Sequence, residues 1–199
     1  SWSSNNTSVA TVNSSGLVRG VAAGSATITV TTQDGNRTAT SSITVTTTSQ
    51  TPFGGTARAI PGTIQAEDFD NGGQGVAYND VDAGNSGGQY RTGERVDIEN
   101  CSEGGFNVGW MRAGEWLEYT VNVAQAGTYT LQARVSSGLS GRTFHVEMNG
   151  VNVSGTITVP NTGGWQNWQT VSVTTTSLTT GTKVMRIVIN SNDFNLNSG

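Results

Sequence analysis

The sequence contains one cysteine and one histidine, and charged residues make up only 12% of its 199 positions. Because Cys101 has no partner in the chain, an intrachain disulfide and a cysteine-based metal cluster are both excluded. A catalytic triad would have to pass through His145. In the segment TFHVEMNG, Phe144, Val146 and Met148 form the apolar parity, which places His145 on the opposite face in mid-strand. This position argues against a catalytic histidine.

Basic residues and long apolar runs are also scarce. Ten Lys and Arg residues stand against fourteen Asp and Glu residues, which gives a net charge of −4 and a pI of about 4.8. A nucleic-acid-binding protein needs a basic surface, so no nucleic-acid partner is expected. No apolar run approaches the roughly 20 residues that span a bilayer, so no membrane span is expected. The chain opens at Ser1-Trp2 without a signal peptide, as expected for a fragment of a longer protein.

Thr, Ser, Asn and Gly are abundant, and these short or β-branched residues favour strands and turns over helices. No stretch shows a 3.6-residue repeat over three turns, so the chain is predicted to be all-β. Many antiparallel strands predict a two-sheet sandwich in the second part of the chain. The predicted strands there are residues 62–67, 95–99, 115–123, 128–136, 143–149, 156–159, 167–174 and 183–190.

Two tryptophans follow glycine-rich turns, and a third interrupts the parity of a strand. Trp110 comes after Gly104-Gly105, and Trp165 directly follows Gly163-Gly164, where the backbone leaves room for a ligand. Trp116 has the opposite parity to Leu117 and Tyr119, so it faces away from the core. Planar aromatic side chains cover the apolar C–H faces of sugar rings. These positions therefore suggest a surface that meets a flat, partly apolar ligand.

Residues 1–48 contain short alternating strands separated by turns. The run WSSNNTSVATVNSSGLVRGVAAGSATITVTTQDGNRTATSSITV closely resembles a bacterial Ig-like domain of group 2. The resemblance implies a spacer without a ligand site, and a partial Ig-like β-sandwich, since such domains carry about thirty more residues before this point. Residues 49–59, SQTPFGGTARA, lack periodicity and are predicted to be a linker.

Residues 60–199 carry five motifs of one family in the correct order. IQAEDFD, NVGWMRAGEWLEYTVNV, AGTYTLQARV, NTGGWQNWQTV and FNLN closely resemble a carbohydrate-binding module of family 6. The resemblance implies a β-jelly-roll that binds polysaccharide and has no catalytic activity. It also implies a secreted protein in which an attached glycoside hydrolase or lyase is directed to its substrate. β-Glucan, xylan and agarose all fit the family.

The resemblance assigns roles to individual residues. Trp110 and Trp165 match the two aromatics that sandwich a sugar, and Asn195 matches the asparagine that hydrogen-bonds it. Trp168, before the alternating strand, is interpreted as structural. Some members also bind sugar on a sheet face through the position that Trp116 holds. That second surface stays an open alternative.

Further candidates come from the long loop before the NVG motif. Family members often bind sugar hydroxyls there through hydrogen bonds to a carboxylate or amide, and Asp97 and Glu99 are the nearest matches. Tyr90, in GNSGGQYR, is a further candidate for the wall of the site. An enzyme would need two carboxylates that flank a sugar about 5–10 Å apart. Asp97 and Glu99 are predicted to share one strand face, which disfavours that interpretation.

The resemblance also implies a structural Ca²⁺. Gln65 and Glu67 are two apart on the predicted first strand, so their side chains are expected to point the same way. With Asn197 and the carbonyl of Phe106 they match the family's oxygen ligands, a donor type that calcium prefers. Family modules continue past NLN into a final strand, whereas this chain ends at Ser198-Gly199. The remaining alternative is an adhesive or structural extracellular segment that binds no sugar.

Overall fold

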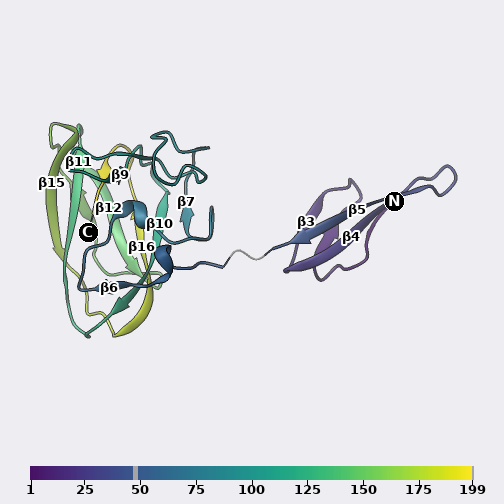
Figure 1. Cartoon of the computed structure of the whole chain (residues 1–199), viewed down its shortest axis with the longest axis horizontal. Helices are drawn as coiled ribbons and strands as arrows, with labels where there is room; N and C mark the ends of the chain where they lie inside the picture. Colours follow the sequence, from purple (N-terminus) through teal and green to yellow (C-terminus); the bar gives the residue numbers. More distant parts are fainter. Residues whose placement is uncertain (47–48, 199) are drawn as a thin grey trace. The chain divides into compact units, whose positions relative to one another are not determined.

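The computed structural model describes residues 1–46 and 49–198 and divides into two compact units, Ser1–Thr48 and Ser49–Gly199 (Figure 1). Both units consist mainly of β-strands, which confirms the all-β prediction. The ends of the predicted ranges at 47–48 and 199 lie outside the described residues. Among the described residues, no helix has the length and apolar character needed to cross a membrane.

The first unit is a small β-structure with a thin core. Its first sheet has the order β1-β4-β5, and β2 and β3 form a separate two-stranded ribbon. Val9, Ala10 and Ala26 form the buried cluster, while all residues of β5 are exposed or half-buried. The strands are β1 (Trp2–Ser4), β2 (Ala10–Val12), β3 (Val18–Gly20), β4 (Gly24–Thr31) and β5 (Thr38–Val45).

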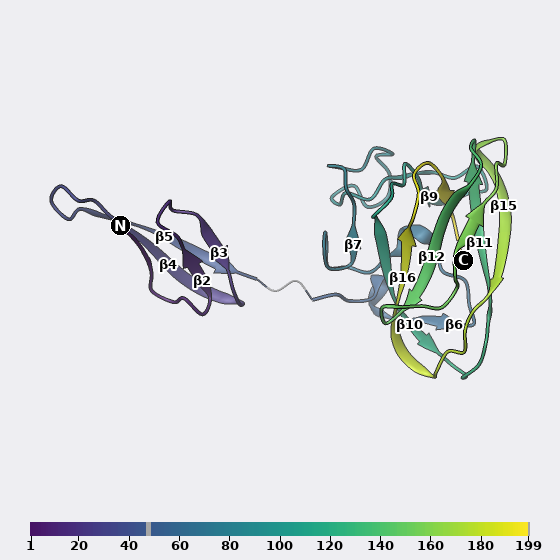
Figure 2. The same ribbon diagram turned by 180° about the vertical axis from the view of Figure 1, so that it is seen from behind.

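The second unit is a two-sheet sandwich, as predicted. One sheet has the order β13-β12-β16-β10-β6, with β14 added beside β12 and β7 beside β10. The other has the order β15-β11-β17-β9-β8. Its strands β15 and β11 lie on the opposite side of the unit from β10 and β16 of the first sheet (Figures 1 and 2). The strands of the first sheet are β6 (Arg58–Ile60), β7 (Tyr78–Asn79), β10 (Trp116–Val123), β12 (Arg142–Met148), β13 (Val151–Asn152), β14 (Ile157–Val159) and β16 (Gly181–Ile189). Those of the second sheet are β8 (Ile98–Asn100), β9 (Phe106–Val108), β11 (Thr130–Ser137), β15 (Gly164–Thr174) and β17 (Asn195–Leu196).

The core of this unit lies between the sheets and follows the two-residue period of the strands. Leu117, Tyr119 and Val121 of β10 are buried, as the alternation predicts. Phe144 and Val146 of β12 are buried with them. A cavity of about 320 Å³ opens between the sheets and is lined mainly by apolar residues of this core. Its lining does not include the tryptophans or the polar residues proposed for the ligand.

The predicted strand over residues 62–67 is wrong. After β6 the chain leaves the sheet at Pro61, which has no N–H to donate to a ladder. The segment then buries Ile64 and forms a 3₁₀ turn, η2 (Ala66–Asp68). Gln65 is joined to Ser198 by an isolated β-bridge. The first segment is therefore fixed by packing and a turn, not by a regular strand.

Residues 49–59, where the sequence predicts a linker, belong to the second unit. Thr51 and Asn71 exchange backbone hydrogen bonds of 2.8 and 3.0 Å, and a 3₁₀ turn, η1 (Phe53–Gly55), follows. The guanidinium of Arg91 lies 4.7 Å from the centroid of the Phe53 ring and 3.7 Å from that of Phe69. This buried cation between two aromatic rings holds the segment in place.

Candidate functional site

Four polar side chains from four separate segments converge at one end of the five-stranded sheet. Glu99 Oε1 accepts hydrogen bonds from Asn107 Nδ2 at 3.2 Å, Gln166 Nε2 at 2.8 Å and Asn195 Nδ2 at 3.0 Å. Asn107 and Asn195 are buried, and Glu99 is half-buried. We call these four residues the amide–carboxylate cluster. It joins β8, β9, β15 and β17 through bonds that span up to 96 positions of sequence.

Trp110 borders this cluster through its neighbour Gly109. A Cβ on Gly109 would lie 3.0 Å from Asn195 Oδ1 and 3.4 Å from Glu99 Oε1. Only glycine leaves this space free, so it lets the chain pass directly beside the cluster. Trp110 has φ +47° and is 48% exposed. A left-handed backbone conformation at a bulky residue costs free energy and is often found at functional sites.

Trp165 borders the same cluster through its neighbour Gln166 and through its own backbone carbonyl. The sequence predicts it on a tight turn, whereas the structure places it near the start of β15, and it is 46% exposed. Its backbone carbonyl accepts hydrogen bonds from Asn195 Nδ2 at 2.7 Å and Ser136 Oγ at 2.5 Å. The indole lies against Gly138, where a Cβ would be 3.7 Å from the ring. Neither Trp110 nor Trp165 stacks on another aromatic ring in the described part of the chain.

The structure does not bring Asp97 into the cluster. Its buried carboxylate accepts the N–H of Ser86, and burial raises its pKa. Its backbone carbonyl accepts the N–H of Gly109 at 2.9 Å. The expectation that Asp97 and Glu99 share a strand face fails because β8 begins only at Ile98. The two carboxylates therefore have separate sets of partners.

Tyr90 also lies apart from the cluster. Its ring stacks on Phe106 with centroids 4.8 Å apart and lies 5.9 Å from Phe53. Its hydroxyl donates to Asp68 Oδ1 at 2.9 Å, and burial and this carboxylate raise the pKa of Tyr90 to about 12. Tyr90 thus braces the N-terminal segment of the unit in this structure.

The turn after Trp110 is held by a buried carboxylate. Glu115 Oε2 accepts the N–H of Arg112 at 2.8 Å, and Oε1 accepts the N–H of Val81 at 3.3 Å. Burial raises the pKa of Glu115 to about 7 and that of nearby Asp80 to about 6. These groups fix the geometry of the segment that carries Trp110 and are not exposed to a ligand.

Trp116 faces away from the core, as its parity predicts. In the register of the sheet, Trp116 pairs with Val188, which in turn pairs with His145 of β12. Arg186 lies over the Trp116 ring at 4.3 Å from the centroid and forms an ion pair with the buried Glu118. One face of the indole is thus already covered by a guanidinium. A ligand on this sheet would meet Trp116 beside a charged network.

A second polar site lies where η2, β9 and β17 meet. Glu67 is 6% exposed, and its Oε2 atom is buried without a hydrogen-bond partner. Burial is the main cause that raises the pKa of Glu67 to about 7. The carbonyl of Asn197 accepts the N–H of Ala66 at 2.8 Å, and the half-buried Phe106 begins β9 beside η2. An unpaired buried carboxylate oxygen fits a proton or a cation.

Gln65 does not share the environment of Glu67. Gln65 is exposed and precedes the 3₁₀ turn, whereas Glu67 lies within the turn and is buried. The parity argument fails here because a turn replaces the predicted strand. The amide of Asn197 donates to Cys101 Sγ at 3.4 Å. No group of three His, Cys, Asp or Glu side chains suited to a metal occurs among the residues described, so a cation here would depend on Glu67 with carbonyl and amide oxygens.

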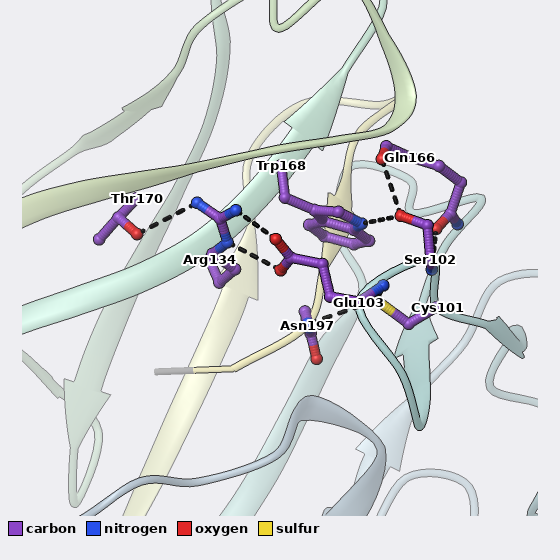
Figure 3. Close-up of polar contacts among 8 residues, drawn as sticks. All are labelled: Cys101, Ser102, Glu103, Arg134, Gln166, Trp168, Thr170 and Asn197. Carbon is purple, nitrogen blue, oxygen red and sulfur yellow. Dashed lines mark hydrogen bonds and ion pairs between the residues drawn. The ribbon is translucent and has the colours of Figure 1, made fainter.

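A loop of residues 101–103 ties the amide–carboxylate cluster to the outer surface of the sheet (Figure 3). Gln166 Oε1 accepts the N–H of Ser102 at 2.8 Å, and Ser102 Oγ donates to the carbonyl of Gln166 at 2.9 Å. Trp168 Nε1 donates to Ser102 Oγ at 3.1 Å, which supports a structural role although Trp168 lies outside the buried core. Arg134 pairs with Glu103 and thereby lowers the pKa of Glu103.

Sequence reasoning missed Gln166 and Asn107 as parts of the site. Both lie beside predicted residues, but their shared partner, Glu99, is 67 positions away from Gln166 and 8 positions away from Asn107. Their only signal in the sequence is an amide next to a candidate residue, in GGWQNW and FNVGW. Such a signal does not tell which amides meet a carboxylate.

Comparison with protein families gives two matches. Residues 87–198 match the family described as carbohydrate binding module (family 6). Residues 1–43 match the bacterial Ig-like domain (group 2). Both resemblances stated from the sequence are confirmed. The first match covers more than half of the chain.

Individual relatives agree with the family match. The chain is 33% identical to the clotting factor G alpha subunit of Tachypleus tridentatus over 112 residues, 54% of this chain and 16% of that protein. It is 31% identical to a β-agarase of Microbulbifer thermotolerans over 97 residues, 47% of this chain and 22% of that protein. The chain thus spans about a fifth or less of the length of these two relatives.

Two solved structures share the fold of the second unit. The C-terminal family 6 module of a laminarinase from Zobellia galactanivorans is 35% identical, with a TM-score of 0.55 over 68% of this chain and 94% of that one. A carbohydrate-binding module from a Cellvibrio mixtus lichenase, solved with cellotriose, is 34% identical, with a TM-score of 0.53 over 69% and 92%. These likenesses confirm the predicted jelly-roll class.

Proposed function

Because the chain belongs to the family 6 carbohydrate-binding modules, which bind carbohydrate without catalysis, we propose that it binds a polysaccharide between Trp110 and Trp165. One observation carries the proposal. Asn195 bonds both the carbonyl of Trp165 and the carboxylate of Glu99, beside Gly109, so two exposed tryptophans border one polar cluster. The indoles would cover the apolar faces of a sugar ring while Glu99 and Asn195 meet its hydroxyls. Trp116 offers a second candidate surface on the other sheet.

The polymer class is proposed as a β-glucan, with xylan and agarose as alternatives. The two structural relatives named above come from a laminarinase and a lichenase, and one was solved with cellotriose. A weak single site is expected, with about −5 to −7 kcal/mol of binding free energy, or dissociation constants of roughly 0.2 mM to 10 µM. Attachment to a glycoside hydrolase or lyase outside the cell would raise the effective concentration at the polymer.

Affinity electrophoresis against laminarin, mixed-linkage β-glucan, xylan and soluble agarose tests this proposal. At least one polymer should retard the protein, and the same polymer should release no sugar during incubation. Failure of all four polymers to retard the chain would favour the alternative of an adhesive or structural segment. Self-association without any response to sugars would support that alternative directly.

We also propose that the region of Glu67 holds a structural Ca²⁺. The buried, unpaired Oε2 of Glu67 supports this, with the Phe106 carbonyl and Asn197 as further oxygen donors. Gln65 would have to turn inward to take part, since its side chain is exposed. The ion would neutralise a buried carboxylate and tie η2 to the last strand.

Calcium is therefore expected to raise the melting temperature of the second unit. At 10 mM Ca²⁺ and a dissociation constant of roughly 0.1 mM, the gain is about 2.7 kcal/mol, or roughly 5–10 °C. The comparison with EDTA is made at pH 8, above the pKa of about 7 at which Glu67 ionises. Without a cation, the raised pKa means that the stability due to Glu67 is present below its ordinary value of 4.5 and is lost as the pH rises through about 7.

Glu67→Gln is the matched control, because it keeps the shape and removes the charge. This variant should melt at nearly the same temperature in Ca²⁺ and in EDTA. A full calcium response in Glu67→Gln, or none in the wild type, would contradict the proposed site.

A further inference from the structure

In the amide–carboxylate cluster, the Nε2 of Gln166 and the Nδ2 of Asn195 each donate to two acceptors inside the protein. Glu99 Oε1 receives three N–H groups, from Asn107, Gln166 and Asn195, at 3.2, 2.8 and 3.0 Å. A carboxylate offers about four lone-pair positions on its two oxygens. Three donors therefore saturate Oε1 and leave Oε2 as the open acceptor. No protein donor contacts Oε2 among the described residues, and it is not one of the buried polar atoms left without a partner.

The orientation of the Asn195 amide is fixed by its neighbours. Nδ2 donates one hydrogen to Glu99 Oε1 at 3.0 Å and another to the carbonyl of Trp165 at 2.7 Å. A flipped amide would place Oδ1 against these two acceptors and lose both bonds. Oδ1 therefore stays on the side of Gly109, where the missing Cβ leaves space beside it. The only group of Asn195 left for a ligand is an acceptor.

Gln166 is oriented in the same way. Its Nε2 lies between Glu99 Oε1 and Asn107 Oδ1, at 2.8 and 3.0 Å. Its Oε1 accepts the N–H of Ser102 at 2.8 Å (Figure 3). A flip would break all three bonds. Gln166 thus connects a braced surface loop to the carboxylate that would face the ligand.

We propose that Gln166, with Asn107, positions Glu99 so that the amide–carboxylate cluster offers a ligand only acceptors, Glu99 Oε2 and Asn195 Oδ1. The site then selects a sugar-ring edge whose hydroxyls donate hydrogen bonds. A sugar hydroxyl can both donate and accept, but Glu99 Oε2 and Asn195 Oδ1 can only accept from it. O-Methylated or fluorinated positions, which cannot donate, are rejected. This inference rests on the proposed sugar binding at Trp110 and Trp165.

Deoxy and deoxyfluoro sugars distinguish donation from acceptance at the site. The probes are laminaritriose and cellotriose with one hydroxyl of the terminal non-reducing ring replaced at a time, measured by isothermal titration calorimetry. At the most sensitive position, loss of the hydroxyl should weaken binding about ten- to a hundredfold, as for hydrogen bonds to charged groups. Fluorine should weaken it about threefold further, because C–F places negative charge against a carboxylate. The expected order is hydroxyl, then hydrogen, then fluorine.

The order of the analogues separates this inference from the proposed function. Binding of the parent sugar with fluorine equal to or better than hydrogen would overturn the acceptor-only site and leave sugar binding intact. Absence of binding to both parent trisaccharides and to all four polymers would overturn the proposed function, and this inference with it.

Two variants of Gln166 test its positioning role. Gln166→Glu keeps the shape and the acceptor for Ser102 but loses the donors to Glu99, and Gln166→Met loses both. Each should reduce the preference for hydroxyl over fluorine to less than about tenfold, because Glu99 is then free to reorient. Gln169→Met, on the exposed part of the same strand, is the control and should keep the wild-type order. Unchanged discrimination in both Gln166 variants would refute the role, even if their melting temperatures fall.

Discussion

Replacing Trp165 with alanine should weaken polysaccharide binding by about two orders of magnitude, since a central aromatic anchor contributes roughly 2–4 kcal/mol. The indole is 46% exposed, so its removal leaves little buried space. The backbone carbonyl of residue 165 still accepts from Asn195 and Ser136 in the variant. The cluster is therefore expected to survive, and the loss should be confined to ring contacts. Trp110→Ala should give a loss of the same order.

The measurement is affinity electrophoresis with the polymer that retards the wild type, followed by calorimetry with its oligosaccharides. Trp116→Ala is the matched control, because it removes an indole from the other sheet. The control should bind like the wild type. Retention of binding in Trp165→Ala together with its loss in Trp116→Ala would move the site to the face of the seven-stranded sheet. There Arg186 already covers one side of the ring.

Asn195→Asp should be the most harmful isosteric change in the site. Asn195 is 4% exposed, and its two N–H groups bond Glu99 and the Trp165 carbonyl. Aspartate replaces both donors with a charge next to another carboxylate. A buried charge without its partner costs about 3 kcal/mol or more, which corresponds to a fall of roughly 6–12 °C in melting temperature. Sugar binding should be lost with the geometry of Glu99.

The sign of the pH dependence gives a second measurement for this variant. Two neighbouring carboxyls raise the pKa of one of them, so the deficit in stability grows as the pH rises and shrinks toward pH 4. Asn192→Asp is the matched control, because Asn192 uses only Oδ1, to accept the N–H of Ala113 at 2.8 Å. A carboxylate can still accept that bond. Equal stability of the two variants across this pH range would contradict the proposed geometry.

The sequence alone determined the local periodicities of the chain and its family. The alternation around Leu117 and Tyr119 predicts which face of β10 is buried, because a strand turns successive side chains to opposite sides. It also places Trp116 on the other face. Five ordered motifs identify the module, and they predict Trp110, Trp165 and Asn195 as ligand contacts. These features depend only on residues that are close together in the sequence, so they can be predicted without knowing the fold.

Local patterns were a poor guide where packing overrides them. Residues 62–67 alternate like a strand, yet a proline and a 3₁₀ turn remove them from the sheet. The polar stretch before them looks like a linker, yet Arg91 fixes Phe53 against the unit. The first outcome also involves the carbonyl of Asn197, which accepts the N–H of Ala66, and the second involves Arg91; both partners are far away in sequence.

Only the tertiary structure decided which polar groups meet. Asp97 and Glu99 are equally good candidates in the sequence. In the fold, however, Asp97 accepts the N–H of Ser86, and Glu99 accepts hydrogen bonds from three side-chain amides. Gln166 joins the site because the fold brings the start of β15 within hydrogen-bond distance of Glu99 and Asn107, although β15 and β8 are opposite edges of the sheet. Hydrogen bonds are short-ranged and directional, so their donors and acceptors can be assigned only once the fold has placed them within about 3 Å of each other.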